Sequence, residues 1–244
     1  MAIPSSDIPP WIKWEKVTAH AETHSTVSLV ASPQSVDECR GVIEFAVKRE
    51  LSICPRGQGY SYGDMILNDN HIVLNLRRMN QILDWSPESG RIVAEPGVTL
   101  GDVLFTSMSS NWTVNACPGT PGVSVGGAIS NNVHGKESWK NGNFGDSVVS
   151  LKLLIASGEI LTIDRTEDRR LMEAVVAGMG LLGIIVEATL QLQKVPSPFI
   201  EVSLVPVKNT EEMIEVIERA REKFDSLTGW TDAFAKGPSL GRGC

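Results

Sequence analysis

The chain has 244 residues, enough to bury one hydrophobic core or two smaller cores that share an interface. Its composition is typical of a globular protein, with 42% hydrophobic and 21% charged residues. A net charge of −7, with the basic residues scattered along the chain, argues against binding to nucleic acid.

The N-terminus lacks the basic and apolar regions of a signal peptide, and no apolar run is as long as a transmembrane helix. We therefore expect a cytoplasmic protein without a transmembrane segment, and peripheral association with a membrane stays open. The four cysteines have no metal-binding or redox spacing and predict reduced thiols. His20 and His24 have no acidic or cysteine partner, so we interpret them as surface residues and predict no metal site.

After an N-terminal arm, the predicted elements begin with a strand at 26–31, whose residues alternate along the chain. A capping box at 35–38 predicts a helix that runs to about residue 48. Two short apolar strands follow, at 51–54 and 71–76. A glycine-rich loop lies between these two strands.

This loop has the sequence PRGQGYSYGD at residues 55–64. Glycines at this density make a tight turn or bring backbone N–H groups close to a phosphate. A Rossmann fingerprint requires G-x-G-x-x-G followed by a helix, whereas this loop has a wider glycine spacing and leads into a strand. The loop also lacks the GK[ST] of a Walker A motif. The two commonest nucleotide-binding folds are therefore excluded.

The second predicted unit is rich in hairpins and in glycine. It contains, in chain order, a hairpin, a helix capped by a threonine, a glycine-rich stretch, a second hairpin, a short helix, and a glycine-rich turn with a long strand: residues 81–97, 99–110, 118–136, 148–164, 169–177 and 178–195. Pro196 and Pro198 mark the boundary of a third unit. There we expect a strand at 199–207, a helix at 210–224 and a strand at 229–235.

Three glycine-rich turns, at 56–63, 118–127 and 178–183, each follow a predicted strand. Three turns that each bring bare backbone near a ligand indicate a large, elongated cofactor lying across two units. In the second turn, Ser124 is placed to cap a short helix whose N–H groups point at a pyrophosphate. Tight packing of that helix against a sheet explains its paired glycines equally well, so spacing alone leaves both interpretations open.

Four stretches together carry a resemblance to a known family: RGQGYSYGD, PGTPGVSVGGAISNNVHGK, NGNFGDSV and GLLGIIVEATL. In this order and spacing they resemble the FAD-binding domain of the vanillyl-alcohol oxidase / p-cresol methylhydroxylase (PCMH) type. Within that family they are most similar to the flavin subunits of decaprenylphosphoryl-ribose 2′-oxidases. The stretch GWTDAFAKGPSLGRG resembles the start of the substrate domain in the same enzymes. The resemblance covers roughly residues 14–243.

The resemblance implies an α+β fold. A PCMH-type FAD-binding domain of two α/β subdomains, with FAD between them, is followed by the start of an α+β substrate (cap) domain. The expected boundaries are an N-terminal arm at 1–19, subdomains at 20–78 and 79–196, and an incomplete substrate domain at 197–244.

The resemblance also implies which residues bind FAD. The pyrophosphate is expected at the first two glycine-rich turns, the flavin beside the HGK sequence, and the adenine side at the backbone of the third turn. The implied residues are Arg56, Gly57, Gln58, Gly59, Tyr60, Ser61, Gly119, Thr120, Ser124, Gly126, Gly127, Asn131, Val133, His134, Gly183 and Ile185.

Three of the side chains near this site bear on the chemistry. Several oxidases of the family carry a histidine at the position of Tyr60 and bond it covalently to the flavin, a linkage that tyrosine cannot make, so we expect non-covalent FAD. His134 is expected as a catalytic residue that orients a sugar hydroxyl or takes its proton, because imidazole titrates near neutrality. A structural histidine, hydrogen-bonded beneath the cofactor, is the alternative. Tyr62 is expected to line the substrate pocket as a second catalytic candidate, and core packing is its alternative.

The function that the resemblance implies is FAD-dependent oxidation of a secondary hydroxyl group on a sugar or polyol, with hydride transfer to flavin N5. In the resembled enzymes the substrate is a lipid-phosphate-linked pentose, and a reductase partner completes an epimerisation. Two alternatives stay open. One is an alditol or aldonolactone oxidase that uses oxygen, and the other is a catalytically incomplete FAD-binding fragment, since the chain ends inside the expected substrate domain.

Overall fold

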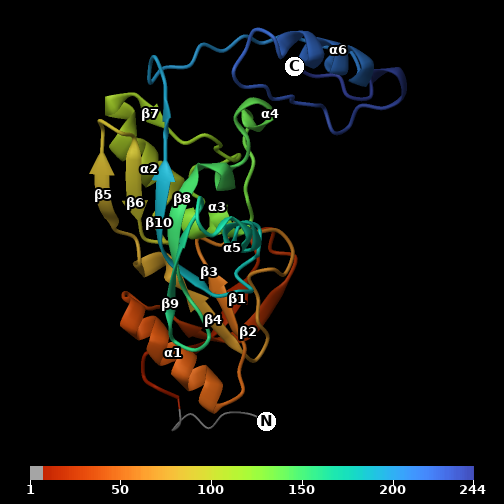
Figure 1. Ribbon diagram of the computed structural model, residues 1–244. Helices are drawn as coiled ribbons and strands as arrows, with labels where there is room; N and C mark the ends of the chain where they lie inside the picture. The colour runs from red at the N-terminus through yellow and green to blue at the C-terminus, as the bar shows by residue number, and fades with distance from the viewer. Residues whose placement is uncertain (1–7) are drawn as a thin grey trace.

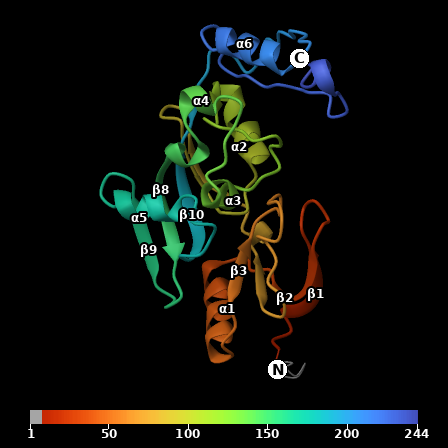
Figure 2. The same cartoon turned by 90° about the vertical axis from the view of Figure 1, so that its right-hand side faces the viewer.

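The computed structural model of the protein describes residues 8–244, and its two main sheets lie one after the other along the molecule (Figure 1). The first sheet has the strand order β1-β2-β4-β3, and the second has the order β5-β6-β10-β8-β9. A C-terminal unit that contains helix α6 lies beyond the second sheet (Figures 1 and 2). Helices and mixed sheets give an α+β fold, as expected.

The first sheet consists of β1 (Ile12–Thr18), β2 (Ser25–Ala31), β3 (Ile53–Arg56) and β4 (Ile72–Asn75). Strands β2, β4 and β3 are parallel, and β1 joins β2 in an antiparallel hairpin. Helix α1 (Val36–Lys48) makes the crossover that a parallel pair requires. Its first turn is capped by Ser35, whose hydroxyl accepts a hydrogen bond from the backbone N–H of Glu38 at 3.2 Å.

Strand β1 corrects the expected N-terminal arm at 1–19, of which residues 1–7 lie outside the described residues. Of the seven strand residues, only Ile12 and Val17 are buried, so the strand does not bury every second side chain as a half-buried strand does. The strand forms because β2 offers a complete set of pairing partners, from Ala31 opposite Ile12 to Ser25 opposite Thr18.

The second sheet consists of β5 (Ile82–Ser86), β6 (Arg91–Ala94), β8 (Val148–Leu154), β9 (Ile160–Asp164) and β10 (Ile184–Gln191), all antiparallel to their neighbours. The helices of this unit are α2 (Leu100–Ser107), α3 (Val125–Ser130), α4 (Ser138–Asn141) and α5 (Arg169–Val175). Short elements between them are β7 (Trp112–Thr113), β11 (Gln193–Lys194), η2 (Leu76–Arg78), η3 (Met108–Ser110) and η4 (Phe144–Ser147). The predicted hairpins and helices are therefore present within a few residues of their expected bounds.

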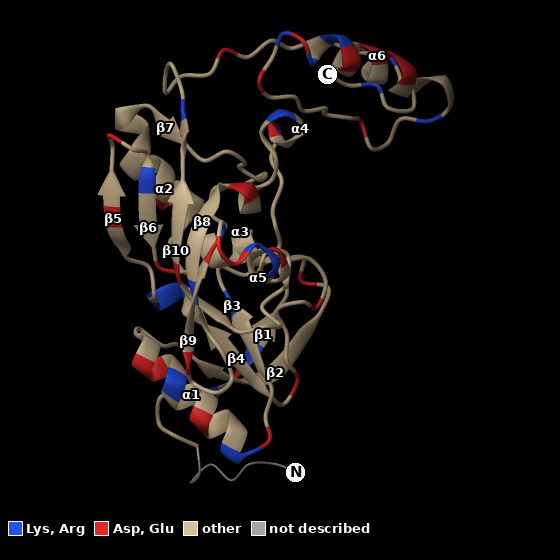
Figure 3. Cartoon of the chain, viewed as in Figure 1, with Lys and Arg blue, Asp and Glu red and all other residues tan. Residues whose placement is uncertain are grey.

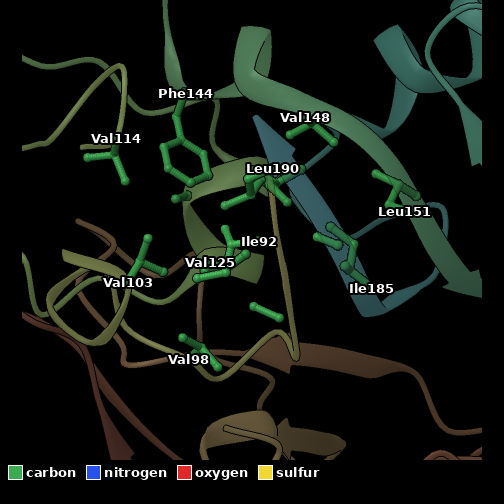
Figure 4. Packing of buried hydrophobic residues seen from close by; sticks show 14 of the residues in the cluster. Ile92, Val98, Val103, Val114, Val125, Phe144, Val148, Leu151, Ile185 and Leu190 are labelled. Carbon is green, nitrogen blue, oxygen red and sulfur yellow. The ribbon is translucent and has the colours of Figure 1, made fainter. Parts of the chain in front are cut away.

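The two units share packed side chains. Figure 4 shows the main core, in which fully buried Phe144 lies among apolar side chains of α2, α3 and the second sheet. A second core lies between α1 and the first sheet. It also contains Leu154, Ile184 and Val186, which come from β8 and β10 of the second sheet. The second sheet thus closes the core of the first unit, which fixes how the two units face each other.

The C-terminal unit differs from the prediction. Helix α6 (Thr210–Ala220) is present, and a short helix η5 (Gly237–Ser239) follows, but the expected strands at 199–207 and 229–235 are wrong. Isolated bridges join Gly243 to Val207 and Thr231 there. Apolar residues with strand propensity remain extended coil because a strand needs a neighbouring ladder for its backbone groups, and this unit supplies none over its described residues.

None of the helices that the structure describes has both the length and the apolar content needed to cross a membrane. Helix α1 carries acidic and basic residues in similar numbers, whereas α6 is mainly acidic, with Arg219 as its basic residue (Figure 3). The four cysteines are free thiols, as expected.

Candidate functional site

The first glycine-rich loop reaches from the first sheet to the second unit. Strand β3 ends at Arg56, and the loop continues beyond the carboxyl edge of the parallel strands. The side-chain amide of Gln58 donates a hydrogen bond to the carbonyl of Gly97 at 3.3 Å, which ties the loop to the second unit. Gly59 has a φ of +84°, a conformation that strongly favours glycine.

The first and second glycine-rich turns touch each other. A Cβ atom added at Gly57 would overlap the hydroxyl of Ser124 and would lie 4.0 Å from the backbone nitrogen of Gly127. A Cβ added at Gly122 would lie 2.6 Å from the hydroxyl of Tyr60. Only bare backbone allows the two turns to come this close, so the glycines set the distance between the two units at this point.

The third turn lies beside the other two. The backbone N–H of Met179 donates to the carbonyl of Ser130 at the end of α3, at 2.9 Å, and Ala177 donates to Ile129. A Cβ added at Gly180 would lie 3.4 Å from the ring of Pro55, next to the first loop. The three turns that the sequence singled out are therefore neighbours around α3, and Figure 2 shows α3 at the junction of the two units.

Many backbone amides of the first two turns have no partner in the described part of the chain. Within residues 8–244, no acceptor is found for the N–H groups of 57–61, or for those of Gly119, Thr120, Ser124 and Gly127. Such N–H groups are normally paired with protein, water or ligand. Converging amides of this kind suit an anion, because each donates to an oxygen without adding a bulky side chain.

Arg56 adds a positive charge beneath these amides. Its guanidinium lies against Gly59, and its buried Nε has no hydrogen-bond partner among the residues that the structure places. Burial, followed by the nearby charge of Arg77, lowers the pKa of Arg56 from its usual value. No carboxylate forms an ion pair with Arg56 in the described part of the chain. A half-buried guanidinium without a counter-charge is a site where an anion is stabilised.

The two paired glycines differ in their surroundings. Gly126 serves packing, because its N–H donates to the carbonyl of Pro96 at 2.9 Å and an added Cβ would lie 2.8 Å from the Pro96 side chain. The N–H of Gly127 stays open toward the first loop. Ser124 occupies the N-cap position of α3, but its side chain makes no capping hydrogen bond. Its buried hydroxyl lies instead beside Gly57, so the expected side-chain cap is corrected.

The turn that carries His134 follows directly after α3. Val133 donates its N–H to Ala128 at 3.0 Å, and Asn131 folds its side-chain amide back onto the carbonyl of Gly127. His134 is exposed, and its ring has no hydrogen-bond partner among the residues that the structure describes. The described part of the chain therefore leaves the ring nitrogens of His134 accessible.

Glu137 holds this turn against the second glycine-rich stretch, and the sequence reasoning missed it. Its carboxylate accepts the backbone N–H of Cys117 at 2.7 Å. A Cβ added at Gly135 would lie 2.7 Å from the backbone of Cys117, so the two segments are in close contact. An acidic residue three positions after the histidine was the available signal, but a carboxylate in a turn is usually solvated and carries little information alone.

Tyr60 and Tyr62 of the first loop are both exposed to solvent. Tyr62 is 74% exposed, which excludes the alternative of core packing, and Tyr60 is 37% exposed. Neither hydroxyl has a hydrogen-bond partner within the described residues. No hydrogen bond or ring contact joins Tyr62 to His134 there, so the two expected catalytic residues are not brought together by the protein itself.

Gly183 and Ile185 can contact a ligand only through their backbone atoms. The side chain of Ile185 is 5% exposed and packs into the main core. The cavity beside these residues has a volume of about 10 Å³, which is room for one water molecule and not for a ring. Any ligand at the third turn therefore lies outside this cavity, over the exposed turn itself.

The C-terminal unit is attached to the turn that follows His134. The backbone N–H of Leu227 donates to the carbonyl of Lys136 at 3.0 Å, and Lys140 forms an ion pair with Asp225. The guanidinium of Arg221 lies 5.5 Å from the ring centroid of Trp139. These contacts hold residues 221–227 of the third unit close to the turn with the exposed histidine.

Comparisons with known proteins identify the family of the chain. A family model described as an FAD binding domain matches residues 27–164. A decaprenylphosphoryl-beta-D-ribose oxidase from Mycolicibacterium smegmatis is 30% identical over 91% of this chain and 48% of its own length. A D-arabinono-1,4-lactone oxidase from Candida glabrata is 27% identical over 82% of this chain and 36% of its own length.

The solved structure of Physcomitrella patens BBE-like 1 has the same fold, with a TM-score of 0.63 and 22% identity over 69% of this chain and 37% of that chain. The chain thus spans half or less of the length of the relatives it matches. The matched region contains the first two glycine-rich turns and the turn with His134.

Proposed function

The protein belongs to the family of FAD binding domains, and from this premise we propose that it serves an oxidoreductase that oxidises a secondary hydroxyl group of a sugar or polyol. One observation carries the proposal. Bare amides from two separate units converge beside an arginine that has no counter-charge within residues 8–244. A diphosphate needs donors on several sides and a nearby positive charge, and this arrangement offers both.

The residues fit FAD in a consistent order along the site. The diphosphate would be held by Arg56 and the amides of 57–61, together with Gly119, Thr120, Ser124 and Gly127. The flavin would lie near Asn131, Val133 and His134, and the adenine side over the backbone of Gly183 and Ile185. Gly126 would contribute through packing, because its amide is already paired with Pro96.

His134 is the residue proposed to act on the substrate. When bound, FAD supplies the hydride acceptor for oxidation of a C–H bond next to a hydroxyl group. The imidazole of His134 is exposed and unpaired within the described chain, so one ring nitrogen can accept the hydroxyl proton or orient the hydroxyl oxygen. Glu137 keeps the turn of His134 against Cys117. Tyr62 is exposed enough to border the same substrate.

The FAD is proposed to be non-covalent because Tyr60 offers no imidazole for a histidyl bond. Denaturing the FAD-loaded protein and separating it from small molecules tests this point. All of the flavin absorbance is expected in the small-molecule fraction. Flavin that stays with the chain would contradict the proposal for Tyr60 without affecting FAD binding.

We further propose that residues 20–78 and 79–196 are the two subdomains of the FAD site, and that residues 197–244 begin a substrate domain. The last segment exposes many apolar side chains for its length, which supports a role as one side of a larger domain. Its attachment next to His134 supports a substrate domain that covers this residue. A lipid-phosphate-linked pentose substrate and a reductase partner are finer parts of the proposal, supported by the resemblance and by the name of the mycobacterial relative.

Titration of the purified protein with FAD, followed by flavin fluorescence, is the first test. Saturable binding with one FAD per chain is expected, and no binding would overturn the proposal. The second test is anaerobic reduction of the bound flavin by a panel of sugars, polyols and aldonolactones. Binding without reduction by any of them would favour an FAD-binding unit that needs further polypeptide for catalysis.

An aldonolactone or alditol oxidase that uses oxygen is the second candidate. The similarity to the lactone oxidase from Candida glabrata supports it. The rate at which air reoxidises the reduced flavin separates the candidates. Reoxidation much faster by oxygen than by an artificial acceptor would favour the oxidase.

A further inference from the structure

The tip of the first hairpin lies over the first glycine-rich loop. Strands β1 and β2 pair along their full length, so residues 19–24 form the turn at the tip. Two backbone hydrogen bonds close this turn, from Ala19 to the carbonyl of His24 and from Glu22 to the carbonyl of Ala19. Figure 2 shows the hairpin rising beside the sheet to the level of the loop that follows β3.

His20 is the residue through which the tip meets the loop. Its ring centroid lies 5.0 Å from that of Tyr60, with the planes inclined at 54°. The same ring lies 6.0 Å from Tyr62 in an edge-to-face arrangement. Both distances are within the range in which aromatic rings attract each other. The histidine that the sequence identified only as a surface residue therefore joins the hairpin to both tyrosines of the loop.

Tyr60 continues this chain of contacts to the second unit. Its hydroxyl lies directly against the backbone of Gly122 in the second glycine-rich turn. Its ring therefore contacts the hairpin tip and the second turn at once, while its own backbone N–H belongs to the unpaired amides of the first loop. A shift of the Tyr60 ring would change the spacing between the two sets of amides.

We propose that His20 is a positioning residue of the FAD site. Its ring holds Tyr60 against Gly122 and so keeps the first two glycine-rich turns at the spacing that the diphosphate requires. His20 acts through Tyr60 and does not itself bind the cofactor. This inference rests on the proposed function, since it concerns how tightly the same site retains FAD.

The chain offers a matched control on the same turn. His24 is also exposed, but its Nδ1 lies 3.0 Å from the hydroxyl of Thr23, and no ring contact joins it to either tyrosine among the described residues. Replacing His24 removes an imidazole from the hairpin tip without touching the loop. Replacing His20 with phenylalanine keeps an aromatic ring at the contact.

The test compares H20A, H20F and H24A with the unmodified chain. The equilibrium constant and the dissociation rate of FAD are measured by flavin fluorescence, and the melting temperature is measured without FAD. For H20A we expect about 3- to 10-fold weaker binding and faster release, as the loss of one or two aromatic contacts implies. H20F is expected to restore most of the affinity, H24A to leave it unchanged, and all apo proteins to melt within about 2 °C of each other.

A double-variant cycle completes the test. If His20 acts through Tyr60, then H20A in a Y60A background causes no further loss of FAD affinity. H20A that binds FAD as tightly as the unmodified chain overturns the inference and leaves the proposed function intact. Equal losses in H20A and H24A, or independent losses in H20A and Y60A, also overturn it. An unmodified chain that binds no FAD overturns the proposed function instead.

Discussion

At the scale of single residues, the site combines glycine backbone with the positive charge of Arg56. Glycine at 57 and 122 lets the turns approach each other, and Ser124 fills the space between them. The half-buried Arg56 sits beneath the open amides without a carboxylate partner in the described chain. Burying this charge costs stability in the empty protein and strengthens its attraction for a bound anion.

Replacing Arg56 with glutamine should separate cofactor binding from stability. We expect FAD binding to weaken about 10- to 100-fold, because charge-assisted hydrogen bonds to phosphate are lost. The empty protein should be at least as stable as before, since an uncompensated charge is removed. FAD titration and urea unfolding measure the two effects. Replacing the exposed Arg78 with glutamine is the control and should change neither quantity. Normal FAD affinity in R56Q would contradict a role for Arg56 at the diphosphate.

Replacing Gly57 with alanine should push the first two turns apart. The added Cβ overlaps Ser124, and over-packing of this kind costs about 1–3 kcal/mol of unfolding free energy. We expect lower stability in urea and weaker FAD binding. Removing the Ser124 side chain in the double variant G57A/S124G should recover both.

Gly101 on α2 is a matched control for this change. The atom nearest to a Cβ added at Gly101 lies 3.5 Å away, so replacing Gly101 with alanine should leave the free energy of unfolding unchanged or raise it slightly. If G57A unfolded at the same urea concentration as the unmodified chain, the close contact between the turns would not exist in solution.

At the scale of elements, helix ends and turns position the site. Helix α2 begins at a complete capping box, in which Thr99 accepts the N–H of Asp102 at 3.1 Å and Asp102 accepts the N–H of Thr99 at 2.9 Å. The next residue, Leu100, donates its N–H to Val123 in the second glycine-rich turn at 2.9 Å. The start of α2 thus supports the backbone from which the open amides project.

Replacing Thr99 with alanine removes one half of this capping box. The expected cost is about 1 kcal/mol of unfolding free energy, measured by urea denaturation. The control is Thr106→Ala on the same helix. The Thr106 hydroxyl donates to the carbonyl of Asp102 at 2.9 Å, a bond that adds little to a helix. Equal losses in T99A and T106A would show that the cap contributes nothing specific.

At the scale of the whole molecule, the two sheets are well covered and the C-terminal unit is not. Leu154, Ile184 and Val186 of the second sheet close the core of the first unit. In contrast, the third unit buries Val207 and Met213 and leaves most of its other large apolar side chains exposed. The exposed group consists of Phe199, Ile200, Val202, Leu204, Val205, Ile214, Phe224, Trp230, Phe234 and Leu240. Such a surface normally meets another polypeptide or a ligand.

This exposed surface should bind an apolar dye. We expect strong fluorescence from anilinonaphthalene sulfonate added to the folded chain, and a large decrease in a variant with Phe199, Leu204 and Phe234 all replaced by serine. Phe105→Ser is the control, because Phe105 on α2 is 91% exposed but lies outside this unit. A triple variant that binds as much dye as the unmodified chain would show that these side chains do not form an apolar surface in solution.

Local patterns predicted most of the elements but not all of their contacts. The capping residues and the apolar periods of α1, α2 and the hairpins were visible because they depend on residues two to four positions apart. Strand β1 was missed because it buries only two of its seven side chains. The strands of the C-terminal unit were over-predicted because the strand propensity of a segment does not depend on whether a neighbouring strand is there to pair with it. The role of Glu137 and the position of His20 were also missed, since each depends on a contact with a distant segment.

The amino-acid sequence by itself determined the α+β class, the three glycine-rich turns and the family resemblance, because all of these depend on residue types and on their short spacings along the chain. Only the tertiary structure decided which amides remain open over the described residues, that Gly126 packs while Gly127 stays available, and that Arg56 has no counter-charge among those residues. The physical reason is the range of the interactions. A turn is specified by its own few residues, whereas an unpaired donor or an unmatched charge is defined by everything that surrounds it after the two units have packed together.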